Sequence, residues 1–60
     1  MSEEELVATL ADMLDLVDRS DYVCSDDLAT ELQEELEDRL TDNQFYLIAE
    51  LVETWWNLQE

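Results

Sequence analysis

Apolar side chains recur every three or four residues along most of the chain, which is the period of an amphipathic α-helix. The first such segment follows Ser2, with Glu5 three residues later in the pattern of a helix-capping box. Its apolar positions are Leu6, Val7, Leu10, Met13, Leu14 and Val17. The pattern predicts a helix over about residues 3–19, with acidic side chains on the opposite face.

A second amphipathic helix is predicted over about residues 26–40. Its apolar positions are Leu28, Ala29, Leu32, Leu36 and Leu40. Ser25 is the expected N-cap, because a serine hydroxyl can accept a hydrogen bond from a free N–H in the first turn. The preceding stretch SDYVCS interrupts the periodicity, and we expect it to connect the first two helices.

A third helix is predicted over about residues 42–58, where Thr41 and Gln44 form a second capping box. Its apolar positions are Phe45, Leu47, Ile48, Ala49, Leu51, Val52, Trp55, Trp56 and Leu58. This stripe is wider than packing on one face requires. We therefore expect the third helix to be the central core element, or to contact another molecule as well.

Three amphipathic segments with short connections predict an all-α protein, a compact three-helix bundle that forms a single domain over residues 1–60. The sequence contains no glycine and no proline. Tight β-hairpins usually need Gly or Asn at positive φ, so a β architecture is not expected. Sixty residues lie near the lower limit for folding on one hydrophobic core.

Acidic side chains dominate the polar positions. Eighteen Asp and Glu residues oppose two Arg, without Lys or His, for a formal net charge of −16. Such a charge repels nucleic acid and anionic lipid, and attracts basic protein surfaces in a salt-sensitive way. No apolar run approaches the ~20 residues of a membrane span, and the acidic start MSEEEL is unlike a basic signal peptide. We expect a soluble, cytoplasmic protein that binds neither nucleic acid nor membrane directly.

The residues that usually carry catalysis are nearly absent. Without His, Lys or a glycine-rich loop, the chain lacks a common general base, an amine nucleophile and a phosphate-binding loop. The acids around residues 15–27 lack the spacing and the glycine of an EF-hand loop. Cys24 is the single cysteine, and we expect it to be partly buried and inert. We expect no enzymatic activity, no metal site and no cofactor.

The stretch DDLATELQEELEDRL, residues 26–40, places like charges close together on a helix. The like-charged pairs three or four residues apart are Asp27–Glu31, Glu31–Glu34, Glu31–Glu35, Glu34–Glu37, Glu34–Asp38 and Glu35–Asp38. Each such pair costs about 0.2–0.5 kcal/mol, so the sum is about 1–3 kcal/mol. Glu35–Arg39 is the favourable exception. Because a small domain has only a few kcal/mol of stability, the charge indicates a role other than stability.

The charge density is close to that of a polynucleotide. Duplex DNA carries one negative charge per about 1.7 Å of its axis. A bundle of helices of about 16 residues is about 24 Å long, so the net charge amounts to about one per 1.5 Å. The sequence predicts a row of anions that occupies the Lys- and Arg-lined groove of a basic nucleic-acid-binding protein. The expected contact residues are Asp12, Asp15, Asp18, Asp21, Asp26, Asp27, Glu31, Glu34, Glu35 and Asp38.

The chain is small, lacks catalytic groups and contains acidic stretches such as ADMLDLVDRSD and TELQEELEDRL. In these respects the chain resembles the small phage-encoded nucleic-acid-mimic inhibitors, which include anti-CRISPR and anti-restriction proteins. The resemblance implies a host-defence target, for example a CRISPR surveillance complex whose DNA-binding channel is blocked. It also implies action in the cytoplasm of the host cell.

Three other interpretations of the same features are open. A run of charges is usually a solvated helix face without a further role. Acid-rich, lysine-free composition is also typical of proteins adapted to molar salt, where screening removes the self-repulsion. Finally, a small interaction module such as an antitoxin or adaptor would use the third helix, with Trp55 and Trp56 as anchors, or would form a homodimer through it. Core filling is the competing role of the two tryptophans.

Overall fold

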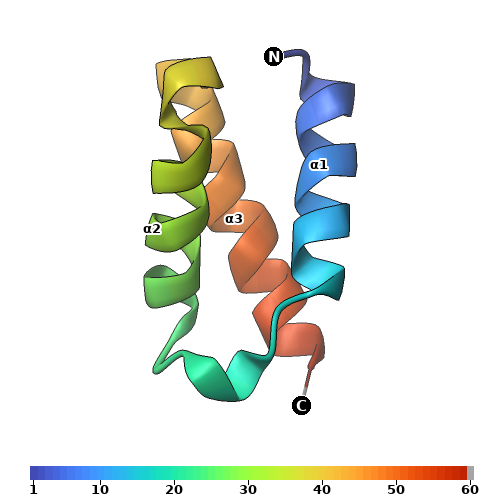
Figure 1. The fold of residues 1–60 in the computed structure, drawn as a ribbon, viewed down its shortest axis with the longest axis vertical. Coiled ribbons are helices and arrows are strands. Elements are labelled where there is room, and N and C mark those ends of the chain that lie inside the picture. The colour runs from blue at the N-terminus through green and yellow to red at the C-terminus, as the bar shows by residue number, and fades with distance from the viewer. Residues whose placement is uncertain (60) are drawn as a thin grey trace.

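The computed structural model describes residues 1–59 as a bundle of three α-helices (Figure 1). The elements in chain order are α1 (Glu3–Asp15), the 3-10 helix η1 (Arg19–Asp21), α2 (Ser25–Leu36), the 3-10 helix η2 (Glu37–Arg39) and α3 (Asp42–Leu58). Figure 1 shows α1 and α2 side by side, with α3 running behind and between them. The molecule measures 29 × 17 × 17 Å. The prediction of an all-α three-helix bundle is confirmed.

The core is formed by apolar side chains from all three α-helices. Its buried members are Leu6, Leu10, Leu14, Leu28, Ala29, Leu32, Leu36, Ile48 and Val52. Residues 1–59 include no buried polar or charged side chain. Removal of apolar surface from water therefore supplies the main driving force for folding, and the acidic side chains of this range all lie on the surface.

Two of the three predicted helix starts are confirmed by their capping hydrogen bonds. The Ser2 hydroxyl accepts from the Glu5 N–H at 3.1 Å. At α3, Thr41 Oγ1 accepts from the Gln44 N–H at 3.3 Å, and Gln44 Oε1 accepts from the Thr41 N–H at 3.0 Å. These reciprocal bonds satisfy backbone donors that an α-helix leaves free at its first turn.

The prediction that Ser25 caps α2 is wrong. Ser25 is the first helical residue, and Cys24 is the N-cap, in an extended conformation and without a side-chain capping bond. Cys24 is exposed, so the expectation of a partly buried thiol is also wrong. The reason is its position in the connection before α2, outside the helix faces that pack together.

Two predicted helices are too long at their C-terminal ends. α1 ends at Asp15 and not near Arg19, because the Asp18 carboxylate accepts from the Ser20 N–H and starts the separate 3-10 turn η1. α2 ends at Leu36, and its expected last turn is the tighter 3-10 helix η2. The bounds of α3 agree with the predicted range of 42–58.

Hydrogen bonds connect the beginning of α3 to α2 and to Met1, which precedes α1. The Met1 amino group donates to the Arg39 carbonyl at 3.0 Å, and Gln44 Nε2 donates to the Met1 carbonyl. Gln33 Nε2 on α2 donates to the Phe45 carbonyl of α3 at 2.7 Å. These contacts hold α2 and α3 in a fixed relative position at this end of the bundle.

The tryptophans of α3 close the opposite end of the bundle. Trp55 and Trp56 are both half-buried and pack against the core. The Arg19 guanidinium lies 4.4 Å from the centre of a Trp56 ring, at cation–π distance. This geometry favours the core-closing role of Trp56 over a role as an exposed anchor.

Candidate anionic binding surface

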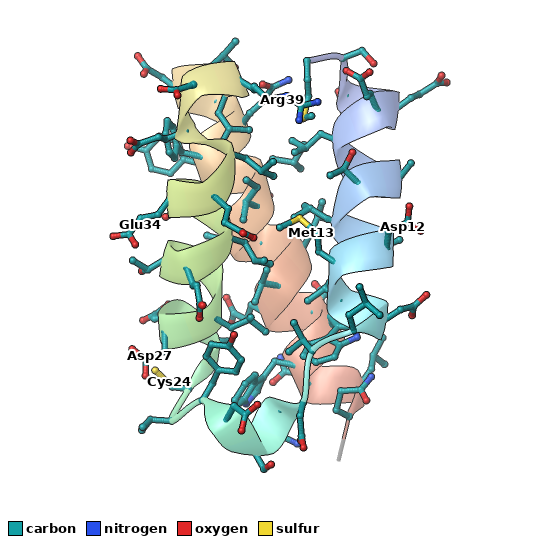
Figure 2. The ribbon with its side chains drawn as sticks, in the orientation of Figure 1. Asp12, Met13, Cys24, Asp27, Glu34 and Arg39 are labelled. Carbon is teal, nitrogen blue, oxygen red and sulfur yellow. The ribbon has the colours of Figure 1, made fainter. Side chains whose placement is uncertain are left out.

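Four acidic side chains form an exposed row along α2 and η2, here called the α2 acidic row. Its members are Asp27, Glu31, Glu34 and Asp38. Their spacing of four, three and four residues places them on one side of the helix, opposite the buried leucines. The row spans about 16 Å at 1.5 Å per residue. Figure 2 shows Asp27 and Glu34 pointing away from the bundle on the free side of α2.

The α2 acidic row stands on a firmly packed helix. On its inner face, α2 buries Leu28, Ala29, Leu32 and Leu36. α2 also packs more extensively on α3 than α1 does. Because the inner face is fixed in the core, the carboxylates of the outer face project from a backbone of fixed geometry.

The ten acidic residues predicted to contact a partner are all exposed, but they do not form one continuous surface. Six of them lie on α2 and η2: Asp26, Asp27, Glu31, Glu34, Glu35 and Asp38. The other four lie on α1, on the following connection or on η1: Asp12, Asp15, Asp18 and Asp21. Figure 2 shows Asp12 and Glu34 pointing outward on opposite sides of the molecule. A single flat contact therefore cannot include both of these side chains.

Neither of the two arginines of the sequence is a member of the α2 acidic row, although Arg39 directly follows Asp38. Arg19 belongs to η1 and contacts Trp56. Figure 2 shows Arg39 on the side of α2 that faces the start of α1, whereas Glu34 points to the opposite side. The segment Ser25–Leu36, which carries three of the four acids of the row, contains no basic residue.

Two groups near the connection between α1 and α2 have shifted pKa values. Asp18 Oδ1 accepts from the Ser20 N–H at 3.0 Å and from the Ser20 hydroxyl at 2.8 Å, and these bonds lower the pKa of Asp18. Hydrogen bonding to the Glu31 carboxylate raises the pKa of Tyr22, and burial and neighbouring negative charges add to this shift. The pKa of Tyr22 is therefore raised by the negative charges of Glu31, Asp21 and Glu35.

The chemistry of this surface is that of an anion. Ionised carboxylates accept hydrogen bonds and pair with Lys and Arg, but they donate none. Across residues 1–59, no group of three or more His, Cys, Asp or Glu side chains is placed to hold a metal ion. The acids are distributed along helices, and this arrangement suits contact with an extended cationic surface.

Sequence reasoning missed a second surface, an apolar groove between α1 and α3, here called the α1–α3 groove. Its lining residues are Val7, Leu10, Ala11, Leu14, Asp15, Leu51 and Trp55, and its volume is about 240 Å³. Val7 was expected in the apolar core stripe, but its side chain is 44% exposed. Two features of the sequence could have indicated this groove. They are the spacing of Val7 and Ala11 on α1, and the wide apolar stripe of α3.

Comparison with protein families, with curated proteins and with solved structures finds no match to this chain. Among the helices of residues 1–59, none has the length and apolar character needed to cross a membrane.

Proposed function

We propose that this protein is a nucleic-acid mimic that inhibits a basic nucleic-acid-binding protein by occupying its binding groove. The observation that carries the proposal is the α2 acidic row, which presents exposed carboxylates from a well-packed helix, with Arg39 on a different side of α2 from Glu34. The Cβ atoms of residues at this spacing lie about 5–6 Å apart, in the range of successive phosphates on a strand. The Lys and Arg side chains that bind phosphate also form charge-assisted hydrogen bonds with carboxylates.

The charge pattern of α2 argues against a surface that serves solubility alone. Soluble surfaces usually intersperse both signs of charge, but the range Ser25–Leu36 contains no basic residue. Glu34 and Glu35 also lie in the last turn of α2, where the helix dipole favours cations. Binding to a cationic groove would offset the repulsion that this arrangement creates in the free protein.

The class of target follows from the compositional resemblance to phage-encoded inhibitors. It is a host-defence complex that grips DNA or RNA, for example a CRISPR surveillance complex, in the host cytoplasm. Such an inhibitor competes with nucleic acid for one groove. Its affinity should fall as salt rises, because screening weakens charge pairing between exposed groups.

The proposal is tested by neutralising four acids of α2 and η2 without changing their size; this protein is called the α2 variant below. The variant carries Glu31→Gln, Glu34→Gln, Glu35→Gln and Asp38→Asn. Displacement of labelled duplex DNA is measured for CRISPR surveillance complexes and restriction enzymes. The unmodified protein should displace DNA from its target, and the variant should be weaker by at least about tenfold, equivalent to about 1.4 kcal/mol.

A matched control removes the same number of charges from α1. It carries Glu3→Gln, Glu4→Gln, Asp12→Asn and Asp15→Asn, and so has the same net charge as the α2 variant. Its displacement activity should exceed that of the α2 variant. An unchanged affinity in the α2 variant, or an equal loss in both variants, would contradict a binding role for the α2 acidic row.

A further inference from the structure

The α1–α3 groove combines an apolar floor with acidic edges. The apolar floor residues are Val7, Leu10, Ala11, Leu14, Leu51 and Trp55. On the α1 side, Glu3 and Glu4 adjoin the surface around Val7 and Ala11, and Asp15 lines the groove itself. On the α3 side, the adjoining acids are Glu50 and Glu53. The groove is thus bordered by carboxylates along both helices.

The groove remains accessible in the folded chain. Of the residues that line it, Val7 is 44% exposed, and Leu51 and Trp55 are half-buried. Farther along α3, Leu58 is 76% exposed. Since α1 packs less extensively on α3 than α2 does, this side of the bundle presents more apolar surface than a closed three-helix core would.

The dimensions suit one additional helix. α1 has 13 residues, and a helix of this length extends over about 20 Å, or three to four turns. A helix of similar length in the groove would pack against α1 and α3. The complex would then resemble a four-helix bundle, in which each helix packs its apolar stripe against two neighbouring helices.

The acidic edges decide which helix fits. A second copy of this chain would place its own Glu50 and Glu53 near the same acids of the first, and each copy carries a net charge of −16. Like charges across an interface suppress association, whereas opposite charges favour it. A helix that binds in an apolar groove also needs apolar side chains of its own at positions i, i+3, i+4 and i+7. The occupant that fits is therefore both amphipathic and basic.

We infer that the α1–α3 groove binds a basic amphipathic helix of a partner protein. The apolar stripe of that helix rests on Val7, Leu51 and Trp55, and its flanking Lys and Arg pair with the acids on both edges. This surface is distinct from the α2 acidic row. The inference therefore does not depend on nucleic-acid mimicry.

The binding test uses the full chain labelled with ¹⁵N and a synthetic helical peptide of leucine and lysine. The peptide places leucine at i, i+3, i+4 and i+7 over four turns. A second peptide has the same composition with scrambled leucine positions. The ordered peptide should shift the indole N–H signal of Trp55 and the amides of Val7 and Leu51, with little change at Trp56, which lies beside Arg19. Equal shifts with the scrambled peptide would show attraction by charge alone and would overturn the inference.

A pair of variants tests the location of binding. Ala11→Gln places a longer polar side chain over the groove at an exposed helical position, so folding should be retained, as circular dichroism can verify. It should weaken binding of the ordered peptide by about tenfold or more. Thr30→Gln, on the exposed side of α2, should leave this affinity unchanged.

Two results with these variants would overturn the inference. One is an affinity for the ordered peptide that is the same in Ala11→Gln and the unmodified chain. The other is a dimer in analytical ultracentrifugation that Ala11→Gln dissociates, because it would assign the groove to a second copy.

Discussion

Tyr22 lies in the short connection before α2, half-buried against the core and within reach of the Glu31 carboxylate. Its hydroxyl can donate to the Glu31 carboxylate, whereas a phenolate would be repelled by it. This difference raises the pKa of Tyr22 above the ordinary value of 10.0. Folding therefore favours the protonated phenol, and the associated stability is present below about pH 10 and is lost as pH rises through the folded-state pKa.

The phenol titration can be followed at a single residue. The sequence has two tyrosines, and Tyr46 is 75% exposed. The substitution Tyr46→Phe therefore leaves Tyr22 as the single titrating phenol, with little effect on packing. Phenolate absorbance of this variant should give a midpoint above 10.0. Adding Glu31→Gln should lower the midpoint, because the carboxylate acceptor is removed. A midpoint that does not respond to this second change would contradict the assigned cause.

At the scale of the helices, periodicity and local hydrogen bonding determine different things. Val17 continues the apolar period of α1, so the pattern predicts a helix that extends past Asp15. In the structure the Asp18 side chain accepts from the Ser20 N–H and the chain leaves the helix. Asp side chains offer the backbone such local alternatives to helical bonding. For this reason, the apolar periodicity predicted which face of each helix is buried better than it predicted where each helix ends.

The like-charge repulsion along α2 predicts that reversing one charge stabilises the protein. Glu34→Lys removes repulsion with Glu31 and Asp38 and replaces it with attraction, so the free energy of unfolding should rise by about 1 kcal/mol. Glu34→Gln should give a smaller gain, because it removes repulsion without adding attraction. Urea unfolding followed by circular dichroism measures both changes. A loss of stability in Glu34→Lys would show that Glu34 makes a favourable contact in the free protein.

At the scale of the whole molecule, the acids repel one another across the entire bundle. The longest dimension is 29 Å, which is close to the Debye length of about 30 Å at 0.01 M salt. At about 1 M salt, the Debye length is about 3 Å. Dilute buffer therefore leaves nearly all charge pairs unscreened, and concentrated salt screens most of them.

The melting temperature should consequently rise with sodium chloride. An increase in stability of about 1 kcal/mol corresponds to about 4–8 °C in a domain of this size. Circular dichroism melts between about 0.01 and 1 M salt measure the effect. The α2 variant, in which four acids of α2 and η2 are neutralised, should show a smaller rise in melting temperature with salt. A chain that is unfolded in dilute buffer and folds only in molar salt would favour salt adaptation over mimicry.

The site was less predictable than the fold. The exposure of all ten candidate acids followed from the helical period, since each was predicted on a polar face or in a connection. Their division between two sides of the molecule did not follow from the period. It depends on how α1 and α2 are rotated about their axes when they pack on α3, as the opposite directions of Asp12 and Glu34 show (Figure 2).

The sequence by itself determined the features that depend on neighbours along the chain. These include the helical period, the caps formed by Ser2 and by Thr41 with Gln44, and the spacing of the acids on α2. Only the tertiary structure decided which apolar positions stay exposed, including Val7 at the α1–α3 groove. A groove depends on the separation and rotation of two helices that are distant in sequence, and many residue pairs far apart in the chain determine that packing together.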